Sequence, residues 1–142
     1  MDDPNKHLYA KIGQYVLISN DKNEILLLER LLSKKWPLPG GRLDKKDRGW
    51  EKALAREVKE ETGLLIENLQ PFDIKLIEDP YQIKYCVYHL ASSSNVDDLT
   101  TSNEHSASRW VTKVDIDKLS IDDSPAVKQM LEKYFLIHKD SK

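Results

Sequence analysis

Three glutamates, Glu57, Glu60 and Glu61, have the spacing that places side chains on one face of an α-helix. Like charges at this spacing repel one another by a few tenths of a kcal/mol each, and partial burial raises the cost unless their pKa values shift or a cation binds. Clustered carboxylate oxygens suit a hard divalent cation such as Mg²⁺, with Mn²⁺ as a substitute. A glutamate-rich helix is more often a solvated surface, and that alternative stays open.

A proline- and glycine-rich segment precedes these glutamates. It reads Trp-Pro-Leu-Pro-Gly-Gly-Arg-Leu over residues 36–43. The prolines restrict the chain, and the glycines Gly40 and Gly41 allow the backbone to approach a ligand closely or to adopt a positive φ. The sequence therefore predicts backbone groups and carboxylate ligands within reach of one another.

The helix that carries the glutamates is predicted from Trp50 to Thr62, and Gly63 is a usual residue just beyond a helix C-terminus. Trp50, Ala53 and Leu54 begin an apolar stripe on it. Continued toward the C-terminus, this stripe meets the three glutamates. We therefore expect a core-facing stripe that turns acidic.

Strands are expected on both sides of this helix. Two buried strands, Tyr9–Ile18 and Ile25–Leu28, are predicted to form a hairpin, and two alternating segments, Phe72–Leu76 and Tyr81–Val87, to flank a turn at Asp79-Pro80. Residues 92–103 are predicted to form one long polar loop. A last helix is expected to be capped by Ser124, with Pro125 in its first turn and an apolar face from Val127 to Phe135. These elements indicate one domain, residues 1–142, with an α/β or α+β sandwich.

Composition limits the class of protein. The chain has 142 residues, a formal net charge of −2 and 39% hydrophobic residues, which argues against a basic nucleic-acid coat and against disorder. A single cysteine, Cys86, excludes an internal disulfide framework, and it is expected to be a buried inert thiol. No signal peptide or membrane span is apparent, so a cytoplasmic protein is expected. The histidines are not spaced as a zinc site, and His89 is expected to be an ordinary strand residue.

The residues from Gly41 to Leu64 resemble the Nudix box, G-x5-E-x7-R-E-U-x-E-E-x-G-U, where U is a bulky apolar residue. Arg56 to Leu64 match its C-terminal part throughout. Asp47 stands where the family has Glu, and eight residues rather than seven separate it from Arg56. An extra residue at Arg48 or Gly49 would be absorbed in a loop, where Asp47 either caps the helix or orients the loop. The resemblance extends from about Tyr9 to Val111.

The resemblance implies an α/β/α sandwich with a mixed sheet, and a metal-dependent pyrophosphohydrolase that cleaves the diphosphate linkage of a small nucleoside diphosphate derivative. Glu57, Glu60, Glu61 and the Gly41 carbonyl would hold the metal. Arg56 would pair with a neighbouring carboxylate, and the general base would be a box glutamate or Glu104.

Arg30 and Arg42 flank the expected cleft as candidate phosphate ligands, although each is as readily a surface charge. ADP-ribose is slightly favoured as substrate by Pro80, which lies 16 residues after Leu64, and nucleoside triphosphates stay open. The resemblance allows a homodimer, and neither a membrane nor a nucleic-acid polymer is an expected partner. A non-catalytic nucleotide-binding or regulatory module on the same fold is the alternative function.

Overall fold

The computed structural model describes residues 6–121 and 126–138. Its strands are β1 (Lys11–Ser19), β2 (Ile25–Arg30), β3 (Gly40–Arg42), β4 (Ile66–Asp79), β5 (Gln82–Ser93) and β6 (His105–Val111). Its helices are α1 (Trp50–Thr62) and α2 (Val127–Ile137), with short 3₁₀ turns at Val96–Asp98 and Lys113–Asp117. The expected cap Ser124 and the following Pro125 lie outside the described residues. None of the helices described is long and apolar enough to cross a membrane.

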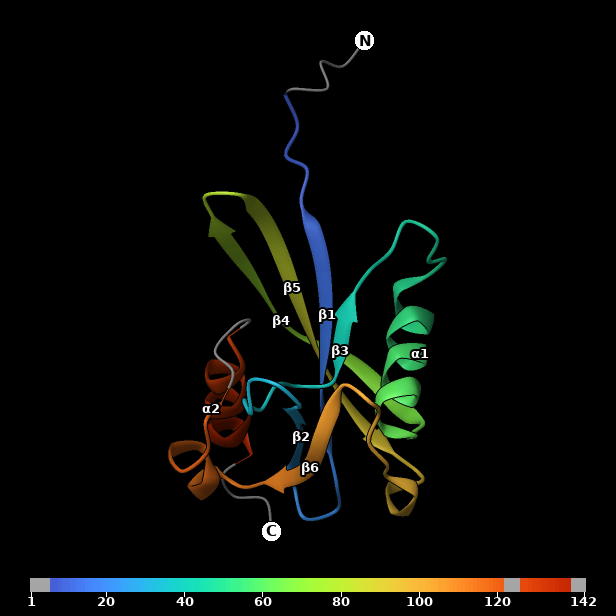
Figure 1. Cartoon of the computed structure of the whole chain (residues 1–142), viewed down its shortest axis with the longest axis vertical. Helices are drawn as coiled ribbons and strands as arrows, with labels where there is room; N and C mark the ends of the chain where they lie inside the picture. The colour runs from blue at the N-terminus through green and yellow to red at the C-terminus, as the bar shows by residue number, and fades with distance from the viewer. Residues whose placement is uncertain (1–5, 122–125, 139–142) are drawn as a thin grey trace.

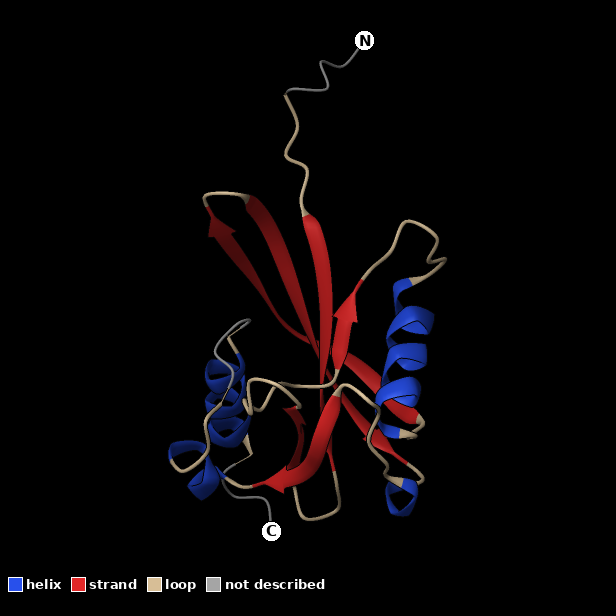
Figure 2. Ribbon diagram, in the orientation of Figure 1, coloured by secondary structure: helices blue, strands red, loops and turns tan. Residues whose placement is uncertain are grey.

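A single mixed sheet occupies the middle of the molecule, with α1 and α2 on opposite faces (Figures 1 and 2). The strand order is β4-β5-β1-β2-β6, and β3 pairs with β1 as an additional strand. The pair β1 and β5 is parallel, and the other pairs are antiparallel. This confirms the expected sandwich with a mixed sheet between helices.

The central strand β1 divides the core into two layers because its side chains alternate between the faces. Tyr15 and Leu17 pack in the layer beneath α2, whereas Val16 and Ile18 pack in the layer beneath α1. Burial on both faces explains why this strand has a continuous apolar run rather than an alternating pattern. The predicted hairpin of β1 and β2 is confirmed by the pairing of Ser19 with Ile25.

Several boundaries differ from the sequence-based expectation. Strand β4 begins at Ile66, earlier than the predicted start at Phe72. Register shifts after Glu67 and Pro71 interrupt the alternation of side chains, so the sequence pattern indicated only the later part of the strand. The predicted long loop 92–103 is also wrong in part: its first two residues continue β5, and Val96–Asp98 form a 3₁₀ turn. Strand β6, which follows this segment, was not predicted as a strand.

Candidate active site

Helix α1 places the three glutamates beside its buried face rather than on it. The buried row consists of Ala53, Leu54, Val58 and Thr62. Glu57 and Glu61 are half-buried along its margin, while the side chain of Glu60 is 66% exposed. The expectation that the core-facing stripe itself turns acidic is therefore wrong, since Val58 and Thr62 continue it. Trp50 is also less buried than expected, with 42% of its surface exposed.

The end of α1 follows the expected pattern. Gly63 has φ 74° and its amide donates to the carbonyl of Lys59, which closes the last turn in the left-handed conformation that glycine adopts easily. The helix therefore stops directly after Glu61 and Thr62. This fixes the position of the last carboxylate relative to the sheet.

Glu61 has the most perturbed carboxyl of the three. Burial raises its pKa from 4.5 to about 8, and the charges of Glu57 and Glu104 act in the same direction. A hydrogen bond of 2.9 Å from the Gly40 amide to Oε1, together with the charge of Arg30, opposes this rise. Burial also raises the pKa of Glu57. The site thus favours a proton or a cation at Glu61.

Strand β3 brings the backbone against these carboxylates. Gly40 has φ 140°, and a Cβ there would lie 2.1 Å from the Gln14 carbonyl oxygen. A Cβ on Gly41 would lie 2.7 Å from Oε2 of Glu57. The contact at Gly40 is with backbone, so glycine is needed there, whereas a side chain at position 41 would displace the Glu57 carboxylate. The predicted proximity of the glycine segment to the acidic helix is confirmed.

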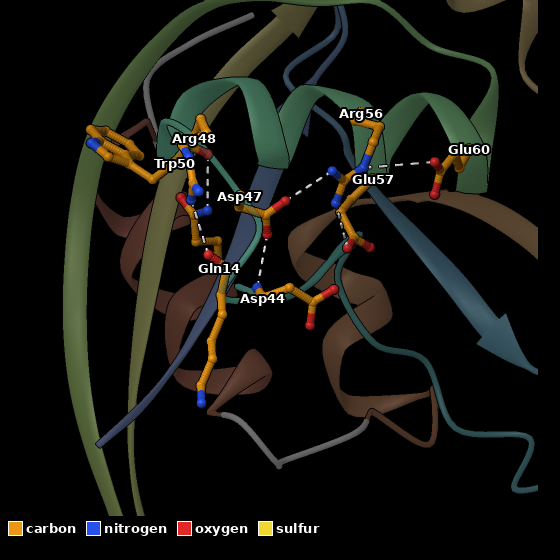
Figure 3. A network of polar contacts seen from close by, with 9 residues as sticks. Gln14, Asp44, Asp47, Arg48, Trp50, Arg56, Glu57 and Glu60 are labelled. Atoms are coloured by element: carbon orange, nitrogen blue, oxygen red, sulfur yellow. Dashed lines mark hydrogen bonds and ion pairs between the residues drawn. The ribbon is translucent and has the colours of Figure 1, made fainter. Parts of the chain in front are cut away.

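Arg56 links the helix to the loop that precedes it, as Figure 3 shows. Its guanidinium lies 2.9 Å from Oδ1 of Asp47, 3.5 Å from Oε1 of Glu57 and 3.7 Å from Oε1 of Glu60. The expected pairing of Arg56 with a neighbouring carboxylate is present. Ion pairing with Asp47 raises the pKa of Arg56.

Asp47 orients the loop and does not cap the helix. Its Oδ2 accepts a hydrogen bond of 2.8 Å from the Asp44 amide, while its Oδ1 receives Arg56. These two contacts lower the pKa of Asp47. Gly49 occupies the N-cap position with φ 99°. Since this backbone suits glycine, the turn into α1 depends on Gly49.

Glu104 lies beside the box glutamates. A cavity of about 430 Å³ is lined by Gly40, Gly41, Glu57, Glu60, Glu61, Ser102, Asn103 and Glu104. The Leu31 amide donates to the Glu104 carbonyl, and the Ser102 hydroxyl accepts from the Glu104 amide. The pairing of Arg30 on β2 with His105 on β6 fixes the position of Glu104, which directly precedes His105. Sequence reasoning missed Ser102 and Asn103, although they immediately precede Glu104 in a polar segment.

The two candidate phosphate ligands occupy different places. Arg30 lines a hollow that also contains Asn103 and Glu104, so it borders the carboxylate cavity. Arg42 lies with Lys11 and Lys45 in a separate hollow. The structure therefore brings Arg30, but not Arg42, next to the carboxylates.

The carboxylates supply hard oxygen donors, as a divalent cation requires. In residues 6–121 and 126–138, however, no three acidic, histidine or cysteine side chains are gathered into a ready set of metal ligands. Arg56 pairs with Glu57 and Glu60, and the Gly40 amide donates to Glu61. The donor chemistry fits a metal, with Glu61 as the residue whose burial most favours one.

His89 and Cys86 belong to the core rather than to this cavity. Both are fully buried in β5. His89 is a strand residue, as expected, and its Nε2 lies 3.2 Å from the side-chain oxygen of Gln14. Cys86 packs in the layer beneath α2, and burial raises the pKa of its thiol.

The fold and the cavity define an α/β/α sandwich with a carboxylate-bearing helix against a glycine strand. A model of the NUDIX domain matches residues 11–134. The chain belongs to the Nudix family. A solved Nudix hydrolase from Nitrosomonas europaea superposes with a TM-score of 0.76 at 20% identity, covering 90% of each chain, which shows the shared fold.

Two curated relatives are similar over shorter segments. A putative 8-oxo-dGTP diphosphatase of Bacillus subtilis (strain 168) is 43% identical over 51 residues, which is 36% of this chain and 34% of the relative. An RNA pyrophosphohydrolase of Ruthia magnifica subsp. Calyptogena magnifica is 41% identical over 60 residues, 42% of this chain and 32% of the relative. The chain thus matches about a third of the length of each curated relative.

Proposed function

We propose that this protein is a metal-dependent pyrophosphohydrolase that cleaves the diphosphate linkage of a small nucleoside diphosphate derivative. The observation that carries the proposal is the cavity that gathers Glu57, Glu60, Glu61, the Gly41 backbone and Glu104. Membership of the Nudix family supports it. The names of the two curated relatives, both of which describe phosphoanhydride cleavage, point to the same class of reaction.

The box residues would hold Mg²⁺, with Mn²⁺ as a substitute. Glu57, Glu60, Glu61 and the Gly41 carbonyl are the proposed ligands. When bound, the cation supplies positive charge for phosphate oxygens and lowers the pKa of a bound water. Arg56 keeps Glu57 and Glu60 on the cavity side of α1, because its guanidinium contacts both.

Glu104 is one of two kinds of candidate for the general base. It lines the same cavity as the box glutamates, where a carboxylate can accept a proton from the attacking water. A box glutamate is the other candidate. Water attack on one phosphorus displaces the other phosphate, and Arg30 borders the cavity where it can contact substrate phosphate.

The test is hydrolysis of a substrate panel by the wild type and by Glu61→Gln, with Mg²⁺, Mn²⁺ or a chelator. The panel contains ADP-ribose, nucleoside triphosphates, 8-oxo-dGTP and an RNA with a 5′-triphosphate. Reaction in ¹⁸O-labelled water identifies the attacked phosphorus. We expect metal-dependent turnover that falls at least about 100-fold in Glu61→Gln, in line with the loss of a group that positions the reactants. Glu51→Gln, an exposed change in the first turn of α1, is the matched control and is expected to retain full activity.

Lack of metal-dependent turnover on every substrate, or full activity in Glu61→Gln, contradicts the proposal. Tight calorimetric binding of a nucleotide that is never hydrolysed would favour the alternative, a non-catalytic binding module. The slight preference for ADP-ribose rests on Pro80, which the structure places in the exposed turn between β4 and β5. The panel decides whether ADP-ribose is preferred.

A further inference from the structure

A second hollow lies on the α1 side of the sheet, at the opposite end of α1 from Glu60. Figure 3 shows Trp50 and Gln14 at one end of the helix and Glu60 at the other. The hollow has a volume of about 370 Å³, within the range of small-molecule sites. Its apolar walls are formed by Ile12, Leu43, Trp50, Pro71, Ile74 and Val87.

Three of these apolar side chains are unusually exposed for their type. Ile12 and Trp50 are each 42% exposed and Ile74 is 59% exposed. Strand pairing places Ile74 beside Val87, and Val87 beside Gln14, in one row across β4, β5 and β1. Helix α1 begins at Trp50, so this part of the sheet face extends beyond its first turn (Figure 1). Gathered apolar exposure of this kind is typical of a binding surface.

The hollow also contains a buried polar pair, Gln14 and His89. The amide nitrogen of Gln14 donates to the Trp50 carbonyl at 2.9 Å, so its oxygen faces Nε2 of His89 at 3.2 Å. An amide oxygen accepts only, so Nε2 carries the hydrogen. Burial lowers the pKa of His89, which disfavours the charged ring. In the neutral ring with its hydrogen on Nε2, Nδ1 is an acceptor. Within the described ranges, Nδ1 has no hydrogen-bond partner, although His89 is fully buried.

Trp50 stacks on the ring that carries this acceptor and is itself accessible. Its ring stacks on the imidazole of His89 with centroids 4.9 Å apart and an angle of 17° between the planes. A partly exposed aromatic ring beside a bare acceptor suits a flat heteroaromatic ligand that has an N–H group at its edge. Because His89 is fully buried beneath the indole, a ligand reaches Nδ1 only if the indole moves.

The rim of the hollow is basic on one side. An adjoining hollow shares Ile12 and Leu43 with it and is also lined by Lys11, Arg42 and Lys45, with Asp44 as the acidic residue among them. Three positive charges against one negative charge favour an anionic group.

We propose that this hollow is a second nucleotide-binding site, distinct from the carboxylate cavity. The base lies against Trp50 and the aliphatic walls and donates an N–H group to Nδ1 of His89. The phosphate lies toward Lys11 and Lys45. A second copy of the chain fits less well, because an apolar partner would leave Nδ1 without a donor and would not use the basic rim. The proposal does not depend on hydrolysis at the carboxylate cavity.

The test uses AMP as the probe, in a chelator, with calorimetry on the full chain. We expect saturable binding that persists in the Glu60→Gln/Glu61→Gln double variant and weakens at least about 10-fold in Trp50→Ala, as for loss of one base-stacking aromatic. Trp110→Phe, on β6, is the matched control and should bind AMP like the wild type. Lys11→Glu should also weaken binding, whereas Lys22→Glu, in the turn after β1, should not.

A ligand pair tests the hydrogen bond to His89. Purine riboside 5′-monophosphate has the shape of AMP but lacks the amino group, and we expect it to bind at least about 10-fold more weakly. In ¹⁵N spectra of the wild type, AMP should shift the Nδ1 resonance of His89, and the purine analogue should not. This measurement needs no variant, so it also applies if Trp50→Ala fails to fold.

Several outcomes would overturn the proposal. The first is a lack of saturable AMP binding at millimolar concentrations. The second is equal binding of AMP and purine riboside 5′-monophosphate, with no change in the Nδ1 resonance of His89. The third is AMP binding that disappears in the Glu60→Gln/Glu61→Gln double variant but survives in Trp50→Ala. Self-association in sedimentation experiments that Ile74→Glu abolishes, without AMP binding, would instead assign the hollow to a second copy of the chain.

Discussion

Replacement of Glu61 by Gln should make the metal-free protein more stable at alkaline pH. Burial raises the pKa of Glu61 from 4.5 to about 8, so the folded state keeps a proton that the unfolded state releases between these values. Stability supplied by a raised carboxyl pKa is therefore lost as the pH rises through this window. Gln carries no such proton, and its side-chain oxygen still accepts the hydrogen bond from the Gly40 amide.

The size of the effect follows from the same values. At ~1.4 kcal/mol for each pKa unit, the difference between 4.5 and about 8 corresponds to an upper limit of ~5 kcal/mol. Movement of the carboxylate toward water reduces this cost, so we expect Glu61→Gln to gain roughly 1–2 kcal/mol at pH 8.5. For a domain of this size the gain corresponds to a rise in Tm of roughly 3–6 °C. Near pH 5 the two proteins should unfold at nearly the same temperature.

The assay is thermal and urea unfolding between pH 5 and pH 9 in a chelator, followed by circular dichroism. The quantity of interest is the difference between variant and wild type, because the lowered pKa values of His89 and His105 affect both proteins equally. Glu60→Gln is the matched control: its side chain is 66% exposed, so this variant should gain much less stability at pH 8.5 than Glu61→Gln. Added Mg²⁺ should stabilise the wild type at pH 8.5 more than Glu61→Gln. Parallel stability curves for wild type and Glu61→Gln would refute the reasoning.

Two further predictions concern the backbone before α1 and the contacts of Arg56. Gly41→Ala should lower turnover at least about 10-fold with little change in Tm, because its Cβ would lie 2.7 Å from Oε2 of Glu57 and displace that carboxylate. An added Cβ at Gly49 meets open space, but φ there is 99°, so Gly49→Ala should instead cost about 1–2 kcal/mol of stability and leave turnover unchanged. Unchanged turnover in Gly41→Ala together with lowered turnover in Gly49→Ala would show that the contact at Glu57 is unimportant. Asp47→Asn should lower turnover several-fold by loosening Arg56, and Asp47→Glu should restore most of it; equal activity in all three proteins would show that this contact does not position the site.

The helix and the central strand could be predicted from local sequence because their signals are local. Gly63 marks the end of α1 by adopting the left-handed conformation, and apolar spacing marks its buried row. The run Val16–Ile18 identifies a strand buried on both faces. Such features depend on residues that are close in the sequence, so they can be predicted without knowledge of the fold.

Strand β6 depends instead on a partner far along the chain. Its sequence, His-Ser-Ala-Ser-Arg-Trp-Val, is largely polar, and it becomes a strand through antiparallel pairing with β2. This pairing is also what brings Glu104 to the carboxylate cavity, since Arg30 pairs with His105. The sequence identified Glu104 as a candidate through the family resemblance. Its position in the same cavity as the box glutamates is a long-range consequence of the sheet.

The burial of individual glutamates could not be predicted from their helical spacing, and it changes the chemical argument. Helical spacing does not distinguish Glu57, Glu60 and Glu61. In the structure, Glu60 is exposed to solvent and contacts Arg56, whereas Glu61 is largely buried beside Gly40. The cost of negative charge is therefore concentrated at Glu61 rather than shared equally. A formal net charge of −2 conceals this local imbalance. The carboxyl that is hardest to ionise is the one for which a divalent cation would be most favourable, because the cation replaces a proton that burial otherwise retains.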